Sequence, residues 1–152
     1  MRHAVVAVLA FALLCFLSSS FTATAQSRAP VQWARAQSSD AINAQGDNAY
    51  DRKDYTEAMR LYRQAAAMGN ATAEGNVGFL YAKGYGVPQD YAQSVHWYLM
   101  AAEKGQPDAQ HNLALKYWNG QGVTKDPTQA RYWMEKSAAA GDANAQQWLS
   151  EH

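Results

Sequence analysis

A stretch of the sequence, residues 73–105, is repeated in register at residues 109–141. The two copies lie 36 residues apart (109 − 73), and identical residues recur at that spacing through both of them. The recurring pairs are Ala73/Ala109, Tyr81/Tyr117, Gly84/Gly120, Gly86/Gly122, Val87/Val123, Asp90/Asp126, Trp97/Trp133, Ala102/Ala138 and Gly105/Gly141. A fixed period of ~20–50 residues is typical of stacked repeat units. The sequence therefore predicts a stack of two-helix units.

Each copy predicts two helices joined by a glycine-containing loop. In the first copy, residues 71–83 and 91–104 carry apolar side chains at helical spacing, and Asp90 stands where its carboxylate caps the second helix. The second copy repeats this order with helices at 107–119 and 127–141. No sustained alternation of apolar and polar residues predicts a strand. We therefore predict an all-α fold, a short right-handed α-solenoid of antiparallel helix pairs.

Shorter elements extend the repeat at both ends. Residues 40–51 and 55–68 predict a first helix pair with a tighter connection than in the later units. Asp54 is placed to cap the second of these helices, and Glu57, three residues on, to complete a capping box. Residues 143–152 predict a further helix that covers the last apolar face. The predicted domain is 40–152, with units at about 40–70, 71–106 and 107–142 and a capping helix at 143–152.

The first 25 residues predict a secretory signal peptide. A short basic start precedes an apolar run at residues 4–17, and the small residues at 23–25 suit cleavage after Ala25. A membrane-spanning helix needs ~20 apolar residues, so we expect cleavage rather than a retained anchor. Leu14 stands before Cys15 where a lipidation signal carries a small residue. The expected protein is exported, either periplasmic or secreted, and does not span the membrane after cleavage.

Residues 26–39 are polar and rich in small residues, which predicts a flexible linker. The alternative is that Trp33 folds back onto the first helix. Cys15 is the only cysteine and would leave with the signal peptide. The mature chain would then have no thiol for a disulfide, a zinc–thiolate site or a cysteine nucleophile.

Charge and motif content argue against several classes of function. The 13 basic and 13 acidic residues balance without long runs of either sign, so we expect no nucleic-acid partner. The histidines at 96, 111 and 152 form no metal-binding or catalytic spacing. The two GxG motifs follow predicted helices rather than strands, so they are interpreted as turns. We predict no catalytic residues, no cofactor and no metal, and therefore no enzyme.

The two full copies carry a specific string of residues. They read AxxxVGxLYxxGxGVxxD at 73–90 and AxxxLAxxYxxGxGVxxD at 109–126, each followed by a helix with WY or WM that ends AA…G. These strings resemble Sel1-like repeats, and the first unit is more similar to a tetratricopeptide repeat. The resemblance implies a scaffold that binds other proteins or peptides. Some cysteine-rich secreted members bind penicillin-like compounds, but this chain lacks their paired cysteines, so that activity is not expected.

The resemblance to tetratricopeptide stacks also implies binding positions on the concave face, counted from the close-packing residues Gly46, Gly78 and Ala114. These positions predict an apolar strip with polar contacts beside it, which holds a helix or an extended peptide. The strip is Tyr50, Phe79, Leu115 and Trp118, and the polar contacts are Lys83, His111 and Asn119. The alternative is that Phe79 and Trp118 pack against neighbouring units.

We therefore expect an exported, non-enzymatic scaffold for protein–protein interaction. One alternative is a periplasmic regulator that inhibits an envelope sensor or enzyme. Another is a cell-wall glycan-binding protein that uses exposed aromatic residues such as Trp118. Because three units form a small groove, a homodimer joined edge to edge is a further alternative for the working form.

Overall fold

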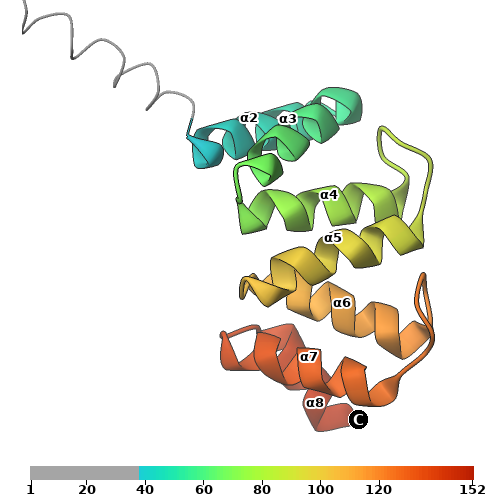
Figure 1. Ribbon diagram of the computed structural model, residues 1–152. Helices are drawn as coiled ribbons and strands as arrows, with labels where there is room; N and C mark the ends of the chain where they lie inside the picture. The colour runs from blue at the N-terminus through green and yellow to red at the C-terminus, as the bar shows by residue number, and fades with distance from the viewer. Residues whose placement is uncertain (1–37) are drawn as a thin grey trace, which may run out of the picture. The chain divides into compact units, whose positions relative to one another are not determined.

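The computed structural model describes residues 38–152, and the predicted signal peptide and nearly all of the predicted linker lie outside these residues. Seven helices and no strand occur in the described part (Figure 1). They are α2 (Ser39–Asp51), α3 (Tyr55–Ala67), α4 (Ala71–Lys83), α5 (Tyr91–Glu103), α6 (Pro107–Asn119), α7 (Pro127–Ala139) and α8 (Ala143–Glu151). Every helix starts at the predicted residue or one residue before it. The predicted all-α solenoid of helix pairs is confirmed.

The helices stack in chain order, from α2 and α3 at one end to α7 and α8 at the other (Figure 1). Each helix packs mainly against the helices before and after it in the sequence, and the first helices α4 and α6 also contact each other. The apolar face of each pair is therefore covered by the neighbouring pairs, as expected of a solenoid. No helix within residues 38–152 is long and apolar enough to cross a membrane.

Two glycines let aromatic rings fill the space inside a helix pair. A Cβ atom built on Gly46 would lie 2.5 Å from Cε1 of Tyr62, and one on Gly78 would lie 2.9 Å from Cδ1 of Tyr98. The third unit carries Ala114 and Met134 at the equivalent positions, and both are fully buried. The two helices of a pair can thus pack closely in either way: glycine faces an aromatic ring, or alanine faces a slimmer side chain.

The loops after α4 and α6 extend on the same side of the stack (Figure 1) and each packs against the preceding unit. Gly86 has φ +71°, and a Cβ there would lie 2.5 Å from the carbonyl oxygen of Tyr55 at the start of α3. Gly122 has φ +76° and makes the same approach to Tyr91 at the start of α5. Only glycine fits both the backbone angle and the contact. Val87 of the first loop packs against the core.

Side-chain caps start every described helix. The predicted caps Asp54, Asp90 and Asp126 each accept a hydrogen bond from a first-turn amide. The first helices are capped as well, which the sequence interpretation did not anticipate. Their caps are Ser38, Asn70, Gln106 and Asp142.

The predicted capping box at α3 is only half formed. Asp54 Oδ1 accepts from the Glu57 amide at 3.2 Å, but the Glu57 carboxylate does not return the bond. It pairs instead with the Arg60 guanidinium at 2.7 Å, and the Asp54 amide donates to the carbonyl of Ala49. The prediction of a return bond from Glu57 was wrong, because the short connection already gives the amide of Asp54 a backbone acceptor.

Candidate functional site

The first helices α2, α4 and α6 form a hollowed surface, which we call the first-helix face. A hollow of about 440 Å³ lies between α2 and α4. Two more, of about 380 Å³ and 160 Å³, lie between α4 and α6. Phe79 lines all three hollows and packs against both buried clusters of the core. This half-buried ring thus packs between units and also forms the wall that the hollows share.

The α2/α4 hollow has an aromatic wall. The rings of Tyr50 and Phe79 meet edge to face with centroids 6.1 Å apart. Tyr85, from the loop after α4, stacks on Tyr55 at 4.4 Å and approaches both rings of the wall. Burial, and then the neighbouring tyrosines and Asp51, raise the pKa of Tyr50. Tyr50 therefore presents a neutral hydroxyl at the rim of this hollow at physiological pH.

A chain of hydrogen bonds holds the polar floor of the same hollow. Tyr62 donates its hydroxyl to Asp47 at 2.8 Å, and Asn43 donates to the second oxygen of Asp47 at 3.2 Å. Asn76 of α4 donates to Asn43 at 3.1 Å, which links the two first helices. Burial and then the bond to Asp47 raise the pKa of Tyr62. Asp47 is thus held in place by two hydrogen bonds, and both Asp47 and Asp51 are exposed.

The larger α4/α6 hollow is polar and carries lysines. Lys116 Nζ donates to Gln121 at 3.0 Å and lies 4.2 Å from the ring centroid of Tyr91. Burial, and then the positive charge of Lys83, lower the pKa of Lys116. Lys83 Nζ in turn lies 5.7 Å from the ring centroid of Phe79. Both ammonium groups therefore lie over aromatic rings, and Lys116 also bonds to a carboxamide.

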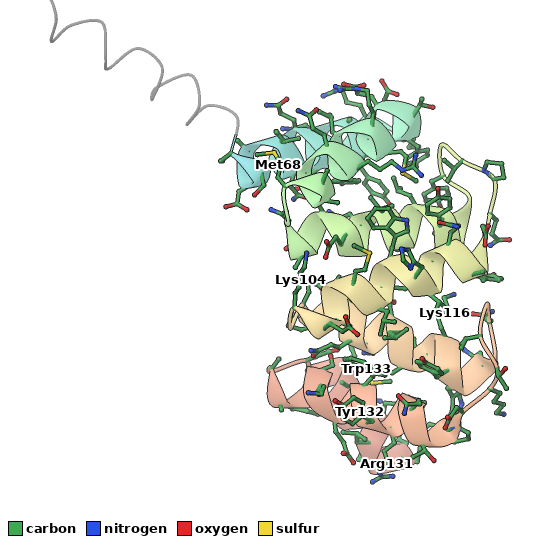
Figure 2. The ribbon with its side chains drawn as sticks, in the orientation of Figure 1. Met68, Lys104, Lys116, Arg131, Tyr132 and Trp133 are labelled. Carbon is green, nitrogen blue, oxygen red and sulfur yellow. The ribbon has the colours of Figure 1, made fainter. Side chains whose placement is uncertain are left out.

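Trp118 lies in a separate hollow of about 420 Å³ toward the C-terminal end of the described chain. Its ring meets those of Trp148 and His152 edge to face, each at 5.1 Å. Tyr132 of α7 lines the same hollow and is 47% exposed. Figure 2 labels Tyr132 beside Arg131, which also lines it. This aromatic cluster is distinct from the hollows that contain Phe79.

His111 contacts the start of α8. Its Nδ1 lies 2.8 Å from Oδ2 of Asp142, and the hydroxyl of Ser137 donates to the same oxygen at 2.8 Å. Burial alone would raise the pKa of Asp142. The bonds from Ser137 and from two backbone amides, together with His111, outweigh burial and lower it. His111 thus joins α6 to the cap of α8.

The structure distributes the predicted site residues over four places. Tyr50 and Phe79 share the α2/α4 hollow, and Phe79, Lys83, Leu115 and Asn119 share the larger α4/α6 hollow. Trp118 and His111 lie apart from these, in the surroundings described above.

Several lining residues were not singled out from the sequence. Lys116 immediately follows Leu115, but the spacing rule for binding positions passes over it. Gln89 and Gln121 stand in the loops, and nothing in their local sequence signals that the loops bring them to this face. Within residues 38–152, no three histidine, cysteine or acidic side chains gather as a metal site would require.

The repeat units match a known family. The family model described as Sel1 repeat matches residues 42–70, 71–106 and 107–142. Among curated proteins, no sequence matches the chain.

Solved structures share this fold. A Sel1 repeat protein from Oxalobacter formigenes is 36% identical with a TM-score of 0.68, over 70% of this chain and 44% of that one. A protective antigen present in uropathogenic Escherichia coli strains is 39% identical with a TM-score of 0.74, over 79% of this chain and 27% of that one. This chain thus spans less than half the length of either. Cysteine rich protein B of Helicobacter pylori, 23% identical with a TM-score of 0.58 over 60% of this chain and 68% of that one, shares the fold.

Proposed function

The chain belongs to the Sel1 repeat family, and from this premise we propose that it is a non-enzymatic scaffold that binds a segment of a partner protein on its first-helix face. Sel1 repeat proteins generally mediate protein–protein interaction. The observation that carries the proposal is the position of Phe79, which forms the shared wall of three hollows between consecutive first helices. A row of hollows along one face suits an extended or helical segment better than a small molecule.

The chemistry of the face supports a peptide ligand. Tyr50 and Phe79 offer half-buried aromatic surface, the type of residue that most often anchors a protein partner. Asn76, Asn112 and Asn119 supply carboxamides along the hollows, which can bond to a partner's backbone in either polarity. An aromatic strip with polar groups beside it is the usual composition of such an interface.

The proposed place of action is outside the cytoplasm, in the periplasm or in the secreted fraction. The basis is the basic start, the apolar run at 4–17 and the small residues before position 26 in the sequence. The partner would then be an envelope or extracellular protein, and a regulatory role toward an envelope sensor or enzyme is a special case of the same binding.

A second candidate function is the binding of cell-wall glycan. It rests on the hollow that Trp118, Tyr132 and Trp148 line, because sugar rings pack on exposed aromatic faces. Arg131 and Glu135 at this hollow could bond to sugar hydroxyls. Sedimentation with purified peptidoglycan tests this candidate directly, with Trp118→Ala as the variant that should lose binding.

The proposed scaffold function is tested by affinity capture from envelope extract, followed by mass spectrometry. The test variant is Phe79→Ala with Leu115→Ala. The matched control is Val95→Ala with Leu99→Ala, which removes half-buried apolar side chains from the second helix α5. Melting temperatures of both variants are compared, because both lose core contacts.

A partner captured by the wild type and the control, but not by the test variant, supports binding on the first-helix face. Equal capture by all three proteins contradicts it.

Light scattering of the same samples tests the proposed edge-to-edge homodimer, which predicts twice the monomer mass.

A further inference from the structure

The hollow between α2 and α4 combines an aromatic wall with negative charge. Its volume of about 440 Å³ lies within the range of ligand pockets, ~300–1,000 Å³. Asp47 and Asp51 are its charged lining residues, and no lysine or arginine lines it. The remaining lining residues are uncharged, and several are aromatic: Tyr50, Tyr62, Asn76, Phe79 and Leu80. The hollow thus offers a cation both carboxylates and aromatic surface.

Both aspartates depart from the pattern of the repeat. Aligning the close-packing glycines of the first and second units sets an offset of 32 residues (78 − 46). At that offset Asp51 corresponds to Lys83, and Asp47 corresponds to Phe79. Neither position is acidic in the third unit. The first unit alone therefore brings carboxylates to this part of the first-helix face.

The position of these aspartates is unfavourable for the helix that carries them. Asp51 is the last residue of α2, and Asp47 lies one turn before it. A helix C-terminus carries roughly half a negative charge, which repels a carboxylate and attracts a lysine. Both α4 and α6 have a lysine in their last turn, whereas α2 has no basic residue there. A cation bound in the hollow would therefore stabilise this end of α2.

Neither aspartate has a cationic partner within residues 38–152. None of the ion pairs in this part of the chain includes them. Arg52 and Lys53 follow Asp51 directly, but both are exposed and neither lines the hollow. Asp47 accepts one hydrogen bond on each oxygen, which holds its carboxylate in place and leaves lone pairs on both oxygens. The two carboxylates are thus accessible to a cation from outside.

The aromatic wall favours a guanidinium over an ammonium. The rings of Tyr50 and Phe79 lie 6.1 Å apart, and Tyr85, from the loop after α4 (Figure 1), lies 6.4 Å and 6.3 Å from them. A guanidinium is planar and weakly hydrated, so it stacks on such rings while its N–H groups bond to carboxylates beside them. An ammonium is a compact and strongly hydrated charge, so it gains less from the rings.

We propose that the α2/α4 hollow binds an arginine side chain of the partner segment, with the guanidinium between the aromatic wall and the two aspartates. The larger α4/α6 hollow shares Phe79 as a wall but is lined by Lys83 and Lys116, so it repels the same side chain. The arginine thus fixes where along the first-helix face the partner segment lies. This inference rests on the proposed scaffold function and specifies how the partner is recognised.

The test is NMR titration of the purified protein with three small probes. The first probe is acetyl-arginine N-methylamide, the second is its citrulline analogue, which keeps the shape but is neutral, and the third is its lysine analogue. We expect the arginine probe to bind at least about tenfold more tightly than the citrulline probe, since only it makes charge-assisted hydrogen bonds. We also expect it to bind more tightly than the lysine probe, and to shift the signals of α2 and α4.

Asp51→Asn and Asp47→Asn should each remove most of the preference for arginine over citrulline. Glu103→Gln is the matched control, because Glu103 is an exposed acidic residue of α5 outside this hollow. Equal binding of the arginine and citrulline probes, or a preference that survives both aspartate variants, would overturn the proposal. Equal binding of the lysine probe would overturn the guanidinium assignment. The probes need no captured partner, so this failure is separable from failure of the scaffold function.

Discussion

Lys104 Nζ lies 2.5 Å from Oε1 of Glu74, whose side chain is only 1% exposed. The equivalent residues in the later units are Gln110 and Gln146, whose carboxamides donate to the carbonyls of Ala102 and Ala138. A carboxylate cannot donate such a bond. The second unit therefore carries a buried charge that Lys104 has to compensate, and the second carboxylate oxygen of Glu74 has no partner in the structure.

The first prediction concerns this ion pair. Lys104→Met should lower the free energy of unfolding by roughly 2 kcal/mol, less than for a fully buried pair because the Lys104 side chain is 42% exposed. Glu74→Gln should be close to neutral, since the carboxamide can donate to Ala66 as its counterparts do in later units. Urea denaturation of the single and double variants measures both effects. The double variant should recover the stability that Lys104→Met loses, and a purely additive double variant would contradict the argument.

The second prediction concerns Gly78 and the ring of Tyr98. Gly78→Ala should destabilise the protein by about 1–3 kcal/mol, although alanine is the better helix former, because the new Cβ meets the ring and the Ser94 carbonyl. Adding Tyr98→Met reproduces the arrangement of Ala114 and Met134 in the third unit and should restore most of the loss. Thermal unfolding followed by circular dichroism measures this. If Gly78→Ala alone raises the melting temperature, helix propensity outweighs the steric contact.

The period of the repeat was enough to predict the fold. It placed the glycine loops and the aspartate caps at 90 and 126, because these depend on local backbone chemistry that each unit repeats. The bond that does not form at Glu57 shows the limit of that reasoning. The exposed Arg60, one turn later, pairs with the Glu57 carboxylate, and a backbone carbonyl accepts from the Asp54 amide.

The candidate site was predicted less completely than the fold. Tyr50 and Phe79 do share a hollow, since both follow the repeat geometry. Trp118 occupies the position equivalent to Tyr50, but its neighbours are Trp148 of α8 and His152. The helix α4, which takes the corresponding place beside Tyr50, carries Asn76 at the position equivalent to Trp148. The opposite charges of the two hollows depend on which side chains the loops and helices bring together, and a one-dimensional spacing rule does not contain that information.

The third prediction concerns acid stability at Asp142. Its pKa in the folded protein lies below the ordinary carboxyl value, so the stabilisation is present above pH ~4 and is lost as the pH falls through the folded value. Asp142→Asn should reduce stability at pH 7 and flatten the dependence of stability on pH in this acid range. Urea denaturation at several pH values between 6 and 2, followed by circular dichroism, measures this dependence. Parallel pH profiles for the wild type and the variant would contradict the assignment.

The fourth prediction separates a structural from a binding role for Lys116. Burial lowers the pKa of this ammonium, so the unfolded chain binds its proton more tightly than the folded chain does. The stability of the wild type should therefore gain a contribution as the pH rises from the folded pKa toward the ordinary lysine value of ~10.4, and Lys116→Met should lack that contribution.

At neutral pH the same variant, Lys116→Met, should stabilise the unliganded protein by roughly 0.5–2 kcal/mol, the range common for stabilising substitutions. Denaturation at pH 7 and pH 9.5 measures both effects, with Lys136→Met as a control that changes net charge equally. A structural role predicts the reverse, because methionine would lose the bond to Gln121 and the contact with Tyr91. A loss of stability in Lys116→Met at pH 7 would thus indicate that this lysine serves the fold, whereas a gain would indicate that the fold does not need it.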